Sequence, residues 1–161
     1  MSHYTKKQKN GYVILASLLI MALLAVYYDF SAQVNEAIMA RAIPCFSVNR
    51  PVRQAFQVKI RIKMDGRTYP LDPTIGQDGK CLHDIFTTDR SGVVHIRSNQ
   101  TSPYTLGDFF SVWKKPFSDH ELFNTSVLGT HSLQVLINGK PVSSYEDTQL
   151  MPNQKIDIIY R

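Results

Sequence analysis

One short stretch, CLHDIFTTDRSGVVHIRS from Cys81 to Ser98, gathers most of the side chains in this sequence that can do chemistry. It holds two of the five histidines, one of the two cysteines and two carboxylates. Imidazole, thiolate and carboxylate groups bind transition metals, and a thiol beside a histidine can act as a nucleophile. The stretch therefore raises two hypotheses, a metal site and a catalytic site.

A metal site would be built on a hairpin whose turn is formed by residues 89–92. Phe86 then lies opposite His95, with Asp84 and Thr88 as diagonal neighbours of His95 on the same face. The candidate ligands, for copper or zinc, are His95, Asp84, Asp89 and His83. Because a zinc site needs several ligands on one side and this face offers two at most, a single histidine hydrogen-bonded at the sheet surface is the favoured interpretation.

No catalytic arrangement emerges from the same residues. Ser91 lies in DRSGV rather than in GxSxG, and no histidine has a recognisable partner pattern. Cys81 with His83 is the remaining nucleophile pair, but a cysteine outside the cytoplasm is more often bridged or buried. We therefore expect a protein without enzymatic activity.

The stretch also resembles part of a known pattern. SGVVHIRS, YTLGDFFSVWKKPFS and VLINGKPV, with CL upstream, are similar to a family of small, often membrane-anchored extracytoplasmic domains of archaea and bacteria whose function is not characterised. The pattern of that family reads CLxxLHTHDxSGxxHIES, then TLGxFFxxW, then VxVNGK. The resemblance covers roughly residues 57–160 and is most specific from Ser91 to Trp113.

The resemblance implies a transition-metal site that this chain has mostly lost. The positions at which the family carries histidines are occupied here by Phe86, Thr88, Ala55, Gln57 and Lys59. His95 is kept, together with residues of the turn, the helix cap and the core. By resemblance, the stretch is the vestige of a site, and we expect no cofactor, with copper or zinc binding at His95 as the alternative.

An apolar segment, GYVILASLLIMALLAVYYDF from Gly11 to Phe30, indicates a membrane helix. Residues 12–28 contain no charged residue, and about 20 helical residues span a hydrocarbon core of roughly 30 Å. The length of the segment favours an uncleaved anchor over a signal peptide. Lys6, Lys7 and Lys9 precede it, so the positive-inside rule places the N-terminus in the cytoplasm and the rest outside the inner (cell) membrane, in the periplasm or at the cell exterior.

The charge and the cysteines agree with this topology. Three of the 18 Lys and Arg residues precede the apolar segment, which leaves 15 against 13 Asp and Glu, so nothing indicates a nucleic-acid partner. Cys45 and Cys81 both fall on the oxidising side, where a disulfide between them is allowed. Two separate buried thiols are the alternative, and a redox role would need an exposed, easily reduced bridge.

The chain from residue 52 onward predicts strands. Val58, Ile60 and Ile62 alternate with Lys59, Arg61 and Lys63, as expected for a half-buried strand. The three basic side chains form a solvated face, a face that docks an acidic partner, or one that contacts anionic headgroups near the membrane. Asp65-Gly66 and Asn138-Gly139 are hairpin turns. Ile85–Thr88 and Val93–Arg97 are expected to form a second strand pair, and residues 155–160 a final strand.

One helix is expected in this domain. Thr105 is a good N-cap, Asp108 lies in the favourable first turn, and Pro116 ends the helix. Leu106, Phe109, Phe110 and Trp113 form an apolar stripe typical of core residues rather than of a ligand-stacking platform.

Together these patterns predict an N-terminal transmembrane helix and a small α+β domain, a mixed sheet with one packed helix that resembles β-grasp domains. The expected organisation is a cytoplasmic N-terminus (1–10), a transmembrane helix (11–30), a stalk or linker (31–51) and an extracytoplasmic domain (52–161). We expect a non-catalytic binding or accessory domain within a larger membrane assembly. Its partners would be the lipid bilayer, through residues 11–30, and one or more membrane proteins.

Overall fold

The computed structural model describes residues 19–25, 43–79, 81–129 and 131–161. The chain forms two compact units, Met1–Ala40 and Arg41–Arg161. In the first unit residues 19–25 are helical, and all seven are apolar and exposed. They lie inside the predicted membrane helix, while the rest of that helix, residues 1–10 and residues 31–42 lie outside the described residues. Within the described part of the chain, no helix is both long enough and apolar enough to cross a membrane.

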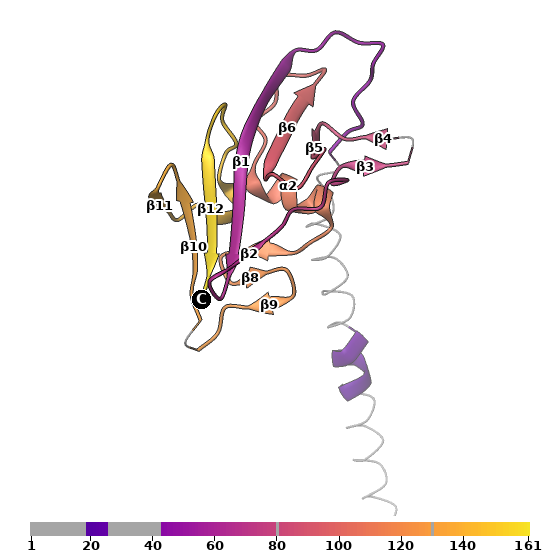
Figure 1. The fold of residues 1–161 in the computed structure, drawn as a ribbon. Helices are drawn as coiled ribbons and strands as arrows, with labels where there is room; N and C mark the ends of the chain where they lie inside the picture. Colours follow the sequence, from indigo (N-terminus) through magenta and orange to yellow (C-terminus); the bar gives the residue numbers. More distant parts are fainter. Residues whose placement is uncertain (1–18, 26–42, 80, 130) are drawn as a thin grey trace, which may run out of the picture. The chain divides into compact units, whose positions relative to one another are not determined.

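The second unit is a mixed α+β domain, as predicted, and consists mostly of strands (Figure 1). Its elements in chain order are β1 (Gln54–Met64), β2 (Arg67–Tyr69), β3 (Gln77–Asp78), β4 (Cys81–Leu82), β5 (Ile85–Phe86), β6 (Val93–Ser98), α2 (Leu106–Trp113), β7 (Phe117–Ser118), β8 (Glu121–Leu122), β9 (Thr125–Ser126), β10 (Leu133–Ile137), β11 (Lys140–Val142), the 3-10 helix η1 (Tyr145–Asp147) and β12 (Lys155–Tyr160).

Seven strands form one sheet around β1. The strand order is β11-β10-β12-β1-β6-β5, and β2 pairs with the end of β1. β1 is parallel to β12 and antiparallel to β6 and β2. In Figure 1 the first strand of the domain therefore lies beside the last one, drawn in yellow. This parallel pairing brings together residues that are almost a hundred positions apart in the sequence.

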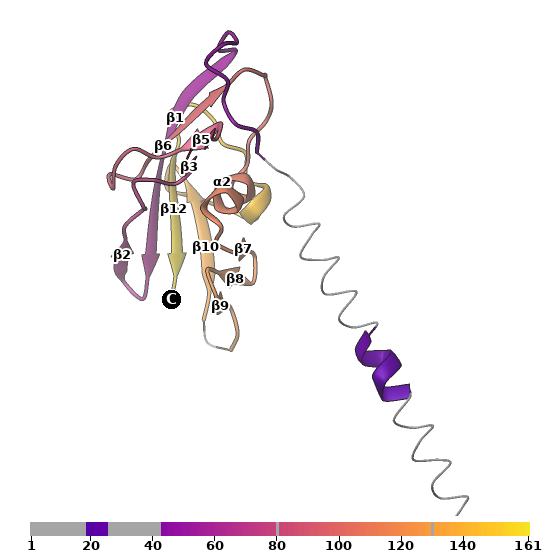
Figure 2. The ribbon, with the colours of Figure 1, turned by 90° about the vertical axis from the view of Figure 1, so that its right-hand side faces the viewer.

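The two faces of the sheet differ in what covers them. On β1, Val58, Ile60 and Ile62 are buried, while Lys59 and Arg61 between them are exposed, which confirms the predicted alternation. Helix α2 lies against one side of the sheet (Figure 2), and its buried residues belong to the same core cluster as those of β1. The opposite side, which we call the open face, carries the side chains of Ala55, Gln57, Lys59, Arg61, Lys63, Val93, His95, Arg97, Lys155, Asp157 and Ile159.

Both predicted two-residue turns are present. Asp65 and Gly66 join β1 to β2, and Asn138 and Gly139 join β10 to β11. All four residues have positive φ, between 49° and 84°. Turns of this kind need that backbone conformation at both central positions, and Asn, Asp and Gly tolerate it best.

Helix α2 begins where the sequence predicts, and it ends at Trp113, where Lys114 forms a left-handed C-cap two residues before Pro116. The Thr105 side chain accepts a hydrogen bond from the Asp108 backbone N–H, and the Asp108 carboxylate accepts one from the Thr105 N–H. This capping box satisfies two amide groups that the first turn leaves unpaired. Phe109 and Phe110 are fully buried. Trp113 is half-buried, and its ring centroid lies 5.3 Å from that of Phe123. The apolar stripe is therefore core, as expected.

Two parts of the domain differ from the prediction. The second strand pair is shorter, because the chain leaves the sheet after Phe86: Thr87 turns inward, is fully buried, and donates its hydroxyl to the Asp72 carbonyl at 2.6 Å. After α2, the sequence predicts a loop with one helical turn over HELFNTSVLGT, whereas the structure has a small three-stranded sheet of β7, β8 and β9 in this region.

Candidate functional site

The four candidate metal ligands do not converge on one site. His95 lies on the open face of β6, Asp89 lies in the β5–β6 loop, and His83 lies beside the disulfide. The prediction that Asp84 shares the face of His95 is wrong: Asp84 is 2 % exposed and faces the core. A bend at Asp84 breaks the alternation of the strand just before β5. In residues 19–25 and the described part of the domain, no three His, Cys, Asp or Glu side chains lie close enough to hold a metal ion.

The side chains that stack on or hydrogen-bond to the His95 ring are neutral. Phe86 lies directly opposite it, as predicted, and the two rings stack with centroids 5.1 Å apart. The Gln57 amide nitrogen is 3.2 Å from Nδ1, and the Thr88 hydroxyl is 3.4 Å from Nε2. Both ring nitrogens thus have polar neighbours other than acids. A hollow of about 580 Å³ opens beside this cluster and is also lined by Ala55, Arg97, Pro152 and Asn153.

Asp84 organises a buried polar network instead. Its carboxyl oxygen Oδ2 accepts hydrogen bonds from the Tyr104 hydroxyl at 2.6 Å and from the Ser98 hydroxyl at 2.7 Å. Burial, together with the bond to Asp84, raises the pKa of Tyr104 to about 12. The Asp84 backbone also donates to the Pro44 carbonyl at 3.2 Å and accepts from the Arg97 N–H at 2.8 Å. Asp84 is therefore a structural residue that joins the core to the segment before β1.

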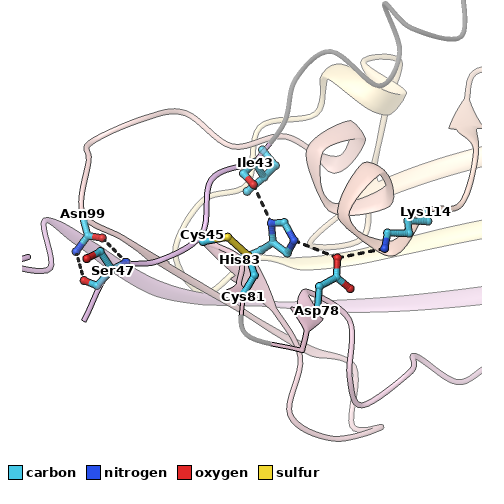
Figure 3. The surroundings of a disulfide bond; sticks show 8 residues. All are labelled: Ile43, Cys45, Ser47, Asp78, Cys81, His83, Asn99 and Lys114. Atoms are coloured by element: carbon cyan, nitrogen blue, oxygen red, sulfur yellow. Dashed lines mark hydrogen bonds and ion pairs between the residues drawn. A yellow bond between two sulfur atoms is a disulfide. The ribbon is translucent and has the colours of Figure 1, made fainter. Parts of the chain in front are cut away.

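The disulfide between Cys45 and Cys81 is present, which confirms that pairing (Figure 3). The two Cα atoms are 5.4 Å apart, and 36 positions separate the residues in the sequence. Cys45 is exposed and Cys81 is half-buried. A disulfide of this kind persists in oxidising compartments and is rare in the cytosol.

His83 lies beside the disulfide and contacts the segment that carries Cys45 (Figure 3). His83 pairs with Cys45 in a single β-bridge, and its Nδ1 lies 2.8 Å from the Ile43 carbonyl oxygen. Its Nε2 lies 3.4 Å from the Asp78 carboxylate, which also accepts from Lys114 Nζ at 3.1 Å. Hydrogen bonds from Lys114 and then from His83 lower the pKa of Asp78. His83 therefore fastens the segment around Cys45 to the domain.

Residues 43–51 belong with the domain, although the sequence prediction starts the domain at residue 52. Ile43 is buried, the Phe46 N–H donates to the Leu82 carbonyl at 2.7 Å, and the Arg97 guanidinium stacks over the Phe46 ring at 4.7 Å. The Asn99 side chain accepts from the Ser47 N–H and donates back to the Ser47 carbonyl. These contacts hold the segment against the domain along its length, so it is not a free linker.

The open face carries a basic cluster at its centre. Lys59 and Lys155 are directly opposite each other on the parallel strands β1 and β12, and Arg61 is opposite Asp157 in the next pair. Arg61 Nε donates to Asp157 at 2.6 Å, and this bond raises the pKa of Arg61. These four side chains line a hollow of about 230 Å³. Lys63, predicted for the same docking face, is half-buried and lies outside this hollow.

Sequence reasoning did not identify Lys155 as part of the basic cluster. The strand pattern of KIDIIY places Lys155 opposite the apolar face of its own strand, but only the parallel pairing with β1 sets it beside Lys59. No local sequence pattern predicts such a pairing, because it depends on which strands become neighbours in the sheet.

Comparison with protein family models, with curated proteins and with solved structures finds no match for this chain. The candidate site is therefore defined by the structure of this chain: an open sheet face with two hollows lined by residues of β1, one beside His95 and one between Lys59 and Lys155.

Proposed function

We propose that this protein is anchored by a single membrane helix and holds its α+β domain outside the cytoplasm, where the domain binds a membrane-protein partner as a non-catalytic component of a larger assembly. The apolar segment from Gly11 to Phe30 and the three lysines before it support this topology. Residues 19–25 expose only apolar side chains, as a helix surrounded by lipid would. The disulfide supports an oxidising location.

The observation that carries the binding role is the open face. A sheet whose one side packs on a helix exposes its other side, and here that side is hollowed and basic rather than evenly polar. The hydroxyl nearest to an imidazole on this face, that of Thr88, lies 3.4 Å from His95 Nε2, and the other ring nitrogen of His95 faces the Gln57 amide rather than an acid. This geometry lacks the orienting carboxylate of a catalytic triad, so the proposed role is to hold a partner rather than to transform one.

The finer fold assignment is also part of the proposal. In a β-grasp arrangement a helix packs on a mixed sheet whose first and last strands are parallel neighbours in the middle. The order β6-β1-β12-β10-β11, with β1 parallel to β12, supports this assignment.

We also propose that the chain is related to the family of extracytoplasmic domains that its sequence resembles. Gln57 lies opposite His95 and Ala55 opposite Arg97, so these positions share the open face with Phe86 and Thr88. Positions at which the family carries histidines thus cluster around the single His95. This clustering supports a common origin of the face and its conversion from a metal site to a binding surface.

The topology can be tested in cells that produce the protein. After alkaline carbonate extraction, we expect the full chain to stay with the membranes, because a lipid-embedded helix resists such extraction. A membrane-impermeant amine reagent applied to intact cells or spheroplasts should label domain lysines such as Lys59 and Lys140, both exposed, while Lys6, Lys7 and Lys9 react only after permeabilisation. Release by carbonate, or labelling of the N-terminal lysines first, would overturn the proposed topology.

A further inference from the structure

We infer that the hollow between Lys59, Arg61 and Lys155 binds a carboxylate side chain of an extended, acidic segment of the protein partner. This inference rests on the proposed binding function and specifies its ligand. The hollow is lined by three cations and one carboxylate, Asp157, which leaves two positive charges around a space of about 230 Å³.

The two lysines are placed so that an anion between them would stabilise the domain. Lys59 and Lys155 are register partners on adjacent strands and both are exposed on the open face. Like charges directly opposite on a sheet are destabilising. Among the described residues neither ammonium group has a carboxylate within 4 Å, so no ion pair within the domain occupies either lysine.

Arg61 is already oriented for such a ligand. Its bond to Asp157 at 2.6 Å fixes the guanidinium beside the two lysines and satisfies one of its donors. A guanidinium has five N–H donors, so others can still bind a carboxylate. Two positions that flank the hollow in the strand register are apolar, Val93 opposite Lys59 and Leu136 opposite Asp157. A less polar environment strengthens a charge-assisted hydrogen bond.

The position of both hollows along one strand favours a peptide over a lipid surface. Both hollows lie along β1, with Gln57 lining the one beside His95 and Lys59 lining the other. Alternate residues of an extended chain are about 7 Å apart on one side. A segment lying along β1 could therefore place a carboxylate between the lysines and an apolar or aromatic side chain beside the stacked Phe86 and His95. A single extended segment reaches both hollows, whereas a lipid headgroup bound in one hollow makes no use of the other.

Binding can be measured with a defined probe. The purified full chain in an uncharged detergent is titrated with a hexaglutamate peptide, with hexaglutamine as the neutral control, and amide shifts or calorimetry report the affinity. We expect hexaglutamate to bind and to shift residues around Lys59 and Lys155. The double variant Lys59→Gln/Lys155→Gln should bind at least tenfold more weakly. The matched variant Arg67→Gln/Lys140→Gln removes the same charge from two exposed positions outside the hollow and should change the affinity less than twofold.

A charge-preserving variant and a lipid probe distinguish peptide binding from a folding defect and from lipid binding. Lys59→Arg/Lys155→Arg keeps both charges and should retain binding, which guards against a fold defect in the glutamine variant. Equal weakening by both glutamine pairs, or no binding of hexaglutamate, would overturn the inference. So would tight binding of phosphatidylglycerol vesicles that needs Lys59 and Lys155 when the peptide does not bind. These outcomes leave the carbonate and labelling results unaffected, so the failure of this inference is distinguishable from failure of the proposed function.

Discussion

Replacing Cys45 and Cys81 with serine is expected to lower the free energy of unfolding of the domain by roughly 3–4 kcal/mol. The bridge closes a loop over 36 positions, and without it the unfolded chain gains the corresponding conformational freedom. The single tryptophan, Trp113, packs in the domain and reports unfolding by fluorescence. Urea denaturation of the full chain in an uncharged detergent gives the measurement.

Reductant provides the control for the disulfide. Wild type treated with dithiothreitol should unfold at the same urea concentration as the double serine variant, whereas the variant should not respond to reductant. Equal unfolding midpoints for the wild type and the variant, both without reductant, would show that the bridge does not stabilise the domain.

Replacing Asp84 with alanine is expected to destabilise the domain by about 3 kcal/mol, since it leaves two buried hydroxyl donors without their acceptor. Tyr104 and Ser98 both donate to the same carboxyl oxygen and are 4 % and 0 % exposed. Asp84→Asn keeps the shape and one acceptor oxygen, so it should cost less. Ser98→Ala removes one of the two donors to Asp84 and the acceptor of the Gln100 N–H, and it should also cost less than Asp84→Ala. Urea denaturation orders the three variants, and a change in Asp84→Ala below about 0.5 kcal/mol would contradict the role assigned to Asp84.

The same network predicts an alkaline transition. The pKa of Tyr104 is raised to about 12 in the folded domain by burial and by the bond to Asp84, from an ordinary value of 10.0. A raised pKa contributes stability that is complete below about pH 10 and is lost as the pH rises toward 12. Tyr104→Phe cannot ionise there, so its unfolding midpoint should fall less than that of wild type over this interval. Parallel curves for the two proteins would contradict the assignment.

Features that depend on local sequence could be predicted. The alternation of β1, the Asp65-Gly66 and Asn138-Gly139 turns, and the capped helix α2 each follow from a pattern within a few residues. The opposition of Phe86 and His95 also followed, because a short loop fixes the register of a hairpin. The Cys45–Cys81 pairing was left open, since the sequence does not give the Cα separation that a bridge requires.

Features that depend on long-range packing could not be predicted. The side that Asp84 faces is decided by a bend in the chain, and the bend is stabilised by Tyr104, 20 positions away. The place of residues 43–51 depends on Asn99, Leu82 and Arg97, all distant in sequence. Lys155 joins the basic cluster only through the parallel pairing of β12 with β1. In each case a tertiary contact outweighs the local pattern.

Photo-crosslinking in native membranes examines the binding role of the open face. A photoreactive amino acid at Gln57, on the open face, should form one discrete adduct with another membrane protein, and Lys59→Gln/Lys155→Gln should reduce that adduct. The same group at Gln149, which is exposed and paired with Thr105 at the start of α2, should form none. Adducts of equal yield from both positions, or adducts with lipid alone, would contradict the proposal that this domain binds a protein partner through the open face of its sheet.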